Sequence, residues 1–390
     1  MAQEFDAEMI CLSANGKTTS SSKDAPRTLL VATTEAVCEF RRADAKSDWT
    51  LVRDDIREGH HVSALLYEPR SKLLFAGQHF EGGLFASADG GQTWSPRNNG
   101  FQSEHVYTLM VQYRGDKTVL FAGTEPVMLY RSDDLGQSWT ALPSVAQVRD
   151  MDKWIFPRSE PHIKNIASHP AEPDTIYVCV EQGDLLKTTD GGKTWSQGDS
   201  IDAPDDKFRR DIHRVTFRKS NPNEIFLTTG IGLYHTTDGA KTWEHLTDPS
   251  FPLGYPDPFF IDPNDENVMY MVGAGGNPNP NWAEEGTAHP LIMKSTDSAW
   301  TWVEAMNGIK KPVRGNIEAA AMHNSQEIGM ELFAGTACGE LYSSRDGASS
   351  WQLISNELPP VSKGPHFRHF LPQAERESYE NKLRAMNAFA

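Results

Sequence analysis

The chain has 390 residues, 38% of them hydrophobic, and a formal net charge of −16 at pH 7. That length and apolar content suffice for a well-buried core, while the acidic charge argues against nucleic acid or an anionic membrane as a partner. No stretch approaches the ~18 consecutive apolar residues of a membrane helix, and no leader-like segment opens the chain. The four cysteines lie far apart without a CxxC pair, which indicates reduced thiols, and we expect a cytoplasmic protein.

A short segment of the general form Ser/Thr-x-Asp-x-Gly-x-Thr/Ser-Trp recurs along the chain. The fifth copy is degraded, with Ala299 in place of the Gly, and a worn seventh copy at residues 42–49 keeps Asp44 and its tryptophan. Successive tryptophans lie 45 to 59 residues apart, the spacing typical of a four-stranded propeller blade. The six clearer copies are residues 87–94, 132–139, 188–195, 236–243, 295–302 and 344–351.

The stretches between these segments predict the same strands in each unit. The first unit begins near residues 8–10 and continues through 28–32. Each later unit opens with an apolar strand such as 62–67, followed by a turn, a second strand, a third strand such as 83–86, the repeated segment, and a fourth strand that begins at the tryptophan. The second strands are expected at residues 72–77, 119–123, 175–180, 224–229, 267–273 and 331–335.

We therefore predict an all-β fold, a single seven-bladed β-propeller of four-stranded blades over residues 1–358. Insertions lengthen the loops at 145–160 and 273–291, on the rim where substrate contacts usually form. Residues 359–390 lie outside the repeat as a C-terminal extension. It is expected to be helical near 373–387 and could cover the ring or mediate self-association.

The repeated segment resembles the Asp-box, or BNR repeat, of the sialidase-like (WD40/YVTN/BNR-like) β-propeller superfamily. Locally, the Asp can accept hydrogen bonds from its own turn, the Gly can take a positive φ, and the Trp can pack between sheets. The resemblance implies that the box lies in the turn between the third and fourth strands, on the face opposite the usual active site. It names no reaction, because the superfamily includes glycosidases, sorting receptors and photosystem assembly factors.

When positions are counted back from the tryptophan of each repeat, four histidines fall at the start of the first strand in consecutive blades. His61, His105, His162 and His213 precede their tryptophans by 33, 34, 33 and 30 residues. First strands line the channel of a propeller, so we expect the four imidazoles to converge and to bind a transition metal. The alternative is a hydrogen-bonded histidine cluster that holds no ligand.

The end of the second strand, which lies beside the start of the first, carries further candidates. Glu35, Glu125 and Glu181 could accept the free N–H of the metal-binding imidazoles, and the alternative is that they are solvated rim residues. His79 occupies the same position in its blade, as a candidate fifth ligand or a general acid or base.

Other residues on this rim are candidates for contact with substrate. Tyr255 and Asn316 fall at or near the histidine position in the sixth and seventh blades, and Asp257 lies nearby; Tyr255 and Asp257 could also be catalytic. Three arginines in the loops before first strands could hold an anionic group, although each is more simply explained as a surface residue. They are Arg57, Arg210 and Arg314, and His366 and His369 of the extension could fold over the mouth.

Four inner histidines backed by glutamates resemble, in architecture only, the site of carotenoid-cleaving non-haem iron oxygenases. Four neutral ligands would leave one or two positions for O2 or substrate. We therefore predict a metal-dependent oxidoreductase, an Fe(II) oxygenase that acts on a small organic substrate, which could be anionic, with Cu, Mn and Zn as the other candidate metals. Neither nucleic acid nor a membrane is expected as a partner, and the extension is a candidate for homo-oligomer contacts.

Two alternative functions stay open. One is a sialidase-like glycoside hydrolase; sialidases of the family use three arginines, a Tyr–Glu pair and an Arg-Ile-Pro motif, which Phe156-Pro157-Arg158 does not match. The other is a non-catalytic binding or assembly propeller, against which the acidic charge and the aligned histidines argue.

Overall fold

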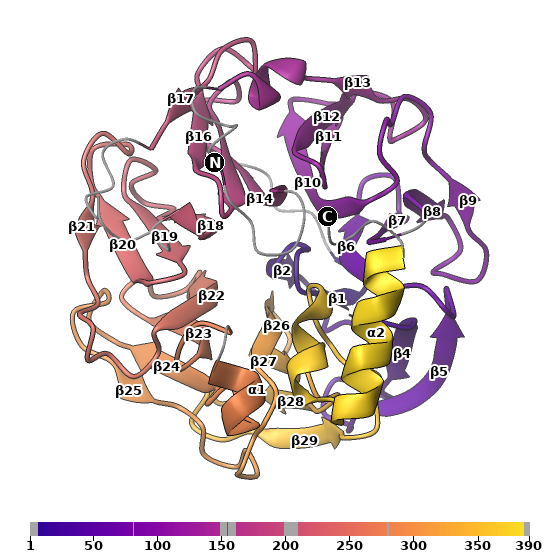
Figure 1. Cartoon of the computed structure of the whole chain (residues 1–390), viewed down its shortest axis with the longest axis vertical. Helices are drawn as coiled ribbons and strands as arrows, with labels where there is room; N and C mark the ends of the chain where they lie inside the picture. Colours follow the sequence, from indigo (N-terminus) through magenta and orange to yellow (C-terminus); the bar gives the residue numbers. More distant parts are fainter. Residues whose placement is uncertain are drawn as a thin grey trace.

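The computed structural model of the chain is a ring of seven β-sheets around a common axis (Figure 1). It describes residues 7–80, 82–148, 154, 161–198, 210–278 and 281–385. Six sheets have four strands and one has five, which confirms the predicted seven-bladed propeller. Within the described ranges, no helix is long and apolar enough to cross a membrane.

Blades two to six are antiparallel meanders, and the first strands of neighbouring blades contact one another around the axis. Blade two is β6 (Val62–Glu68), β7 (Leu73–Gln78), β8 (Leu84–Ser87) and β9 (Ser95–Pro96), and blade three is β10 (Val106–Arg114), β11 (Lys117–Thr124), β12 (Met128–Ser132) and β13 (Thr140–Ala141). Blade four is β14 (His162–Ser168), β15 (Ile176–Glu181), β16 (Leu185–Thr188) and β17 (Ser196–Gln197). Blade five is β18 (Ile212–Phe217), β19 (Ile225–Thr229), β20 (Gly232–Thr236) and β21 (Glu244–His245), and blade six is β22 (Tyr255–Ile261), β23 (Met269–Ala274), β24 (Leu291–Ser295) and β25 (Val303–Glu304).

The N-terminal segment belongs to two blades. Strand β1 (Ile10–Leu12) pairs in parallel with β3 (Thr28–Ala32) as the first strand of blade one, whereas β2 (Thr19–Ser22) pairs in parallel with β26 (Ile317–Ser325) as the fifth strand of blade seven. The chain thus passes from blade one to blade seven and back, which the repeat did not predict. The remaining strands are β4 (Val37–Arg41) and β5 (Thr50–Ile56) in blade one and β27 (Gly329–Thr336), β28 (Leu341–Ser344) and β29 (Gln352–Ser355) in blade seven.

Short helices occupy the insertions and the C-terminal extension. The 3-10 turn η1 (Pro143–Ala146) and helix α1 (Asn281–Glu285) lie in the two predicted insertions. The C-terminal extension forms the 3-10 turn η4 (Pro365–Phe370) and helix α2 (Gln373–Ala385), and η4 contacts both α1 and α2 on one sector of the ring (Figure 1). Most of the first insertion, residues 149–153 and 155–160 with Phe156-Pro157-Arg158, lies outside the described residues.

The Asp-box segments form the turns between third and fourth strands, as the resemblance implied. In the first copy, Asp89 accepts hydrogen bonds from the hydroxyls of Ser87 and Thr93 and from the Thr93 backbone N–H at 2.6–2.9 Å. These bonds hold the pKa of the exposed Asp89 carboxyl below its ordinary value. The motif is looser than its consensus, because alanine holds the fifth position in the last three copies at φ of 64–70°, at Ala240, Ala299 and Ala348.

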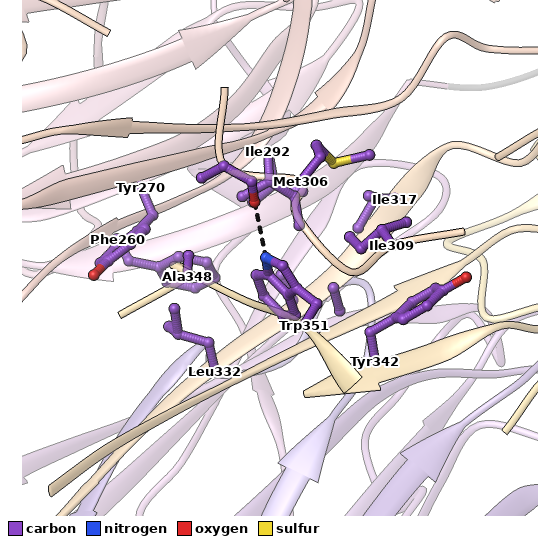
Figure 2. Close-up of a cluster of buried hydrophobic side chains, with 14 of the residues drawn as sticks. Phe260, Tyr270, Ile292, Met306, Ile309, Ile317, Leu332, Tyr342, Ala348 and Trp351 are labelled. Carbon is purple, nitrogen blue, oxygen red and sulfur yellow. Dashed lines mark hydrogen bonds between the residues drawn. The ribbon is translucent and has the colours of Figure 1, made fainter. Parts of the chain in front are cut away.

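The Asp-box tryptophans join neighbouring blades. Trp351 of the last copy lies in a buried cluster with Phe260, Ile292 and Leu332, and its indole N–H donates to the Ala305 carbonyl at 2.8 Å (Figure 2). The cluster draws its residues from blades six and seven, so this tryptophan packs where two sheets meet. The tryptophan that recurs in the sequence therefore marks the place where one blade packs against the next.

Candidate functional site

A β-bulge near the start of the first strand recurs in six blades and determines which side chains face one another across the axis. The first strand has one extra residue there relative to its partner, and in β22 two unpaired residues lie opposite one; bulges of this kind re-aim side chains. The bulged residues are Ser63, Tyr107, Lys164, His213, Asp257 with Pro258, and Glu318. We call this end of the ring the histidine end, and the opposite end the Asp-box end.

The bulges show which residues are equivalent between blades. His61, His105 and His162 stand two residues before their bulges, and in blade five that position belongs to Asp211, not His213. The backbone agrees: the Gly230 N–H donates to Asp211 O at 2.7 Å, as the residue after the second strand donates to His61 O and His105 O in blades two and three. In blades six and seven the same position falls on Tyr255 and Asn316, as expected from the sequence.

His162 connects two glutamates at the centre of the histidine end. Its Nδ1 lies 3.2 Å from Glu125 Oε2 and its Nε2 lies 3.2 Å from Glu181 Oε2, and the ring is fully buried against Tyr107, with centroids 3.9 Å apart. Two of the three predicted glutamates therefore do contact a predicted histidine.

The axis itself is filled by a buried cluster of opposite charges. Asp257 Oδ2 lies 2.6 Å from Lys164 Nζ and 3.6 Å from Lys363 Nζ, and Lys363 reaches on to Glu181 at 3.1 Å. Lys164 also donates to Asn15 of the N-terminal segment at 2.8 Å. Because Lys363 comes from the C-terminal extension and Asn15 from the crossing between blades one and seven, both ends of the chain help to close the axis.

The pKa values follow from burial and from these contacts. Burial alone would raise the pKa of Glu125 and Glu181, but His162 and, for Glu181, Lys363 hold both well below the ordinary value. Burial lowers the pKa of Lys164 to about 8 against the attraction of Asp257. Glu318 is held at a pKa of about 2, since His366 and Lys363 outweigh its burial. This network thus offers ionised carboxylates and not the protonated carboxylic acid that a glycosidase uses as its general acid.

A second group of donors lies beside His162, in blades two and three. One ligand atom from each of His79, His105 and Glu125 lies within 4.8 Å of the others. His79 is 2% exposed, burial lowers its pKa to about 3, and its Nε2 is 3.4 Å from Glu125 Oε2. Phe80 lies against the His79 ring, with centroids 3.7 Å apart.

A third group joins blades four and five, where Glu181, Asp211 and His213 also bring one ligand atom each within 4.8 Å of one another. His213 Nδ1 contacts the Pro256 carbonyl at 2.6 Å and its Nε2 lies 3.4 Å from Asp211. His61 lies apart from this group, with Nε2 2.9 Å from the Ser362 carbonyl. The four predicted metal ligands therefore gather at one end of the ring, but three of them contact protein groups; their role as a four-histidine metal site stays a prediction.

The remaining sequence candidates divide between this network and the surface. Tyr255 and Asp257 are buried within it, with Lys363 Nζ 5.5 Å from the Tyr255 ring, and Asn316 donates to Glu318 at 3.3 Å.

Glu35 is exposed, and so is Arg314, which donates to the Gly286 and Phe370 carbonyls. Arg57 donates to Gln78 and covers the Phe85 ring, and Arg210 is half-buried. In the extension, His366 lies against Glu318, and His369 lies near Trp282, with burial lowering its pKa to about 3.

Sequence reasoning missed several residues of the network. Asp211 precedes Trp243 by 32 residues, closer to the spacing of the other three histidines than His213, so counting back from the tryptophan could have found it. Lys164 and Glu318 lie at bulges, which the periodicity does not reveal. Lys363 and Asn15 belong to segments outside the repeat and carried no signal.

A cavity of about 420 Å³ opens at the Asp-box end. Its wall includes the aromatic residues Tyr67, Tyr113 and Phe217, which lie at or near the ends of first strands. The N-terminal segment supplies a polar side through β2. Charged groups complete the wall, namely Lys17, Lys219, Asp262 and Glu266.

Comparisons with known proteins agree with the fold. The Sortilin-Vps10 family model (sortilin, neurotensin receptor 3) matches residues 129–248. A probable oligoxyloglucan-reducing end-specific xyloglucanase of Neosartorya fischeri is 24% identical over 54% of this chain and 29% of its own length; the Emericella nidulans enzyme is 20% identical over 81% and 43%. The crystal structure of an ancestral GH74 enzyme superposes with a TM-score of 0.59 at 18% identity, covering 75% of this chain and 37% of that one.

These relatives correct the predicted reaction. The prediction of an oxidoreductase, an Fe(II) oxygenase, is wrong, because the matching relatives are xyloglucanases, which are hydrolases, and vacuolar protein sorting/targeting proteins. The alternatives of a glycoside hydrolase or a binding propeller fit the comparisons better. The chain spans less than half the length of the two xyloglucanases, and the structural likeness at 18% identity shows the fold alone.

Proposed function

We propose that this chain, a member of the BNR/Asp-box β-propeller superfamily, is a carbohydrate-binding propeller that takes an oligosaccharide at its Asp-box end. The observation that carries the proposal is the cavity of about 420 Å³ at that end. Its volume lies within the roughly 300–1,000 Å³ of small-molecule sites. The axis at the histidine end is instead filled by buried side chains of opposite charge, Lys164 with Asp257 and Lys363 with Glu181.

The chemistry of the cavity wall suits a sugar. A pyranose ring presents apolar C–H faces, which pack on aromatic rings, and hydroxyl groups, which need both donors and acceptors. Tyr67, Tyr113 and Phe217 supply the aromatic surface. The hydroxyls of residues 19–21 and the charged groups of Lys219 and Glu266 supply the polar partners. The names of the matching relatives make xyloglucan oligosaccharides the first ligands to test.

Hydrolysis of the same ligand is the second candidate, and one observation favours it. Two carboxylates, Asp262 and Glu266, lie in the cavity wall, and glycoside hydrolases work with a pair of carboxylates. Glu266 accepts a hydrogen bond from the Ser220 backbone N–H at 2.9 Å and lies 3.9 Å from Arg218. These contacts hold the Glu266 carboxylate in place as a hydrogen-bond acceptor, so binding is the primary proposal.

The test is calorimetric titration of the full chain with xyloglucan oligosaccharides, with product analysis of the same mixtures by chromatography. Phe217→Ala removes an aromatic wall and should weaken binding about tenfold, the effect of losing ~1.4 kcal/mol. Trp300→Ala is the matched control, because Trp300 is 75% exposed and is not among the cavity-lining residues. It should leave affinity unchanged.

Three outcomes are informative. Binding that depends on Phe217 and leaves the oligosaccharide intact supports a binding propeller. Cleavage that Asp262→Asn or Glu266→Gln abolishes would establish the hydrolase. Absence of binding to xyloglucan fragments and to a broad glycan array, or equal loss in Phe217→Ala and Trp300→Ala, would reject a carbohydrate site in this cavity.

A further inference from the structure

We propose that His79, His105 and Glu125 bind one divalent transition-metal ion of the zinc class at the histidine end. This site is separate from the cavity at the Asp-box end and does not depend on the proposed function. Three properties of the structure carry it: the way two blades bring the donors together, the unsatisfied state of the imidazoles, and the chain of contacts that orients the carboxylate.

The backbone brings the three donors together. His79 follows β7, His105 precedes β10 and Glu125 follows β11, so all three stand where a second strand ends beside the start of a first. The Glu125 N–H donates to His105 O at 3.1 Å, which fixes the two residues side by side. One ligand atom of each residue lies within 4.8 Å of the others. An ion with metal–nitrogen bonds of about 2.0–2.1 Å would draw these donors closer together than this.

The imidazoles lack the partners that buried polar groups normally have. Within the described part of the chain, neither ring nitrogen of His79 makes a hydrogen bond, and Nδ1 of His105 is buried without one. His79 is 2% exposed, so bulk water does not replace the missing partner. Its Nε2 points to Glu125 Oε2 at a distance of 3.4 Å, longer than a normal hydrogen bond. A cation between these atoms would accept a lone pair from one nitrogen of each imidazole and would pair with the Glu125 carboxylate beside His162.

The surroundings hold the donors in place, as outer contacts do in protein metal sites. Glu125 is oriented by His162, which is itself held by Glu181, and Glu181 is held by Lys363. Two aromatic rings pack on the His79 ring, Tyr107 with centroids 4.7 Å apart and Phe80 with centroids 3.7 Å apart. The His79 ring is therefore fixed by packing before any ion arrives.

The donor set selects the kind of ion. Two neutral imidazoles and one carboxylate suit Zn²⁺ and its neighbours in the first transition row, not the all-oxygen preference of Ca²⁺ or Mg²⁺. Three protein ligands leave a fourth position of a tetrahedron for water or a ligand. The group formed by Glu181, Asp211 and His213 is a poorer site, because the Lys363 ammonium and the Pro256 carbonyl already contact its members.

The experiment uses the full chain without a histidine tag, stripped with chelator and titrated with Zn²⁺ by calorimetry. Titration with Co²⁺ reports tetrahedral coordination through its visible absorption. We expect one ion per chain. His79→Ala and Glu125→Gln should each weaken Zn²⁺ binding at least ~100-fold, since even outer contacts of metal sites are worth about 10–100-fold.

Two variants distinguish this trio from other histidines that could bind Zn²⁺. His213→Gln tests the four-histidine set and should leave Zn²⁺ affinity unchanged, because His213 lies outside the proposed trio. His289→Asn controls for adventitious binding to an exposed histidine, since the His289 side chain is 65% exposed beside Glu285. Far-ultraviolet circular dichroism and thermal melting verify that each variant is folded.

The proposal is overturned if the stripped chain binds no stoichiometric Zn²⁺, or if His213→Gln loses binding while His79→Ala keeps it. Oligosaccharide titrations run in parallel, with and without chelator, keep the two proposals apart. If the chain binds no Zn²⁺, the proposed carbohydrate site at the Asp-box end is unaffected. If it binds no oligosaccharide, the proposed metal site is unaffected.

Discussion

The two ends of this propeller share the same seven blades and differ in what the chain termini add to them. At the histidine end, the C-terminal extension inserts Lys363 among buried carboxylates and the axis is closed. At the Asp-box end, β2 of the N-terminal segment forms one wall of a cavity that stays open. A repeat fold thus supplies two similar rings of strand ends, and the non-repeating segments decide which of them remains accessible.

The difference also concerns charge. The ionised groups that fill the axis at the histidine end are buried and paired, so their contribution to stability depends on complete networks. The charged groups in the cavity wall at the Asp-box end are exposed or half-buried, and pairing between such groups contributes little to stability. Substitutions at the closed end should therefore act on stability, and those at the open end on binding.

Lys363→Ala should have the largest effect. It leaves Glu181 and Asp257 buried with fewer cationic partners, and breaking a buried ion pair from one side costs about 3–5 kcal/mol. The free energy of unfolding in urea measures the loss. Lys311→Ala is the matched control, because it removes an exposed pair with Glu304 and should cost less than ~1 kcal/mol. Equal losses in the two variants would contradict a stabilising role of the closed end.

The pH dependence of the free energy of unfolding should show how much Glu318 contributes to stability at the closed histidine end. Its folded pKa of about 2 lies below the ordinary value of 4.5, since His366 and Lys363 outweigh burial. A depressed folded pKa contributes stability that is complete above about 4.5 and is lost as the pH falls toward about 2, here about 3 kcal/mol. The unfolding free energies of the wild type and Glu318→Gln should therefore converge over that window. Parallel pH profiles would show that Glu318 does not hold the extension.

Asn15→Ala should have an intermediate effect. The Asn15 side chain accepts a hydrogen bond from Lys164 at 2.8 Å, and its loss leaves that buried ammonium with one acceptor fewer, at a cost of about 1–3 kcal/mol. Urea unfolding again gives the number. Asn264→Ala serves as control, because Asn264 is exposed and its side chain pairs with the amide of Asn324 at the surface. A loss no larger than that of the control would remove Asn15 from the network.

Much of the fold and part of the site could be predicted from the sequence, because the Asp-box tryptophan marks the contact between blades. Counting back from it located the start of each first strand, and so brought His61, His105 and His162 to one end with Glu125 and Glu181 beside them. In blade five the search for a histidine selected His213, 30 residues before Trp243, although Asp211 at 32 residues fits the spacing of the other blades better. Asp211 stands there instead of His213.

The remaining residues could not be predicted because their contacts cross the fold. Lys363 meets Glu181 across 182 positions of sequence and Lys164 meets Asn15 across 149, and neither Lys363 nor Asn15 belongs to a repeat. The spacing of the Asp-box repeat locates only residues that recur in every blade. Lys164 and Glu318 occupy the same bulge position in their blades, but the residue type at this position differs from blade to blade. No pattern of residue types therefore revealed them.

Lys219→Ala at the open end is the smallest perturbation and the closest counterpart of Lys363→Ala. Lys219 is exposed on the cavity wall, so its removal should change the free energy of unfolding by no more than ~0.5 kcal/mol. If its ammonium meets the bound sugar, the variant should lose a hydrogen bond worth about 0.5–1.5 kcal/mol, a two- to twelvefold fall in oligosaccharide affinity. Calorimetric titration and urea unfolding on one preparation measure both. A stability loss like that of Lys363→Ala would mean that the Asp-box end is as much a part of the packed axis as the histidine end, and the contrast between the two ends would fail.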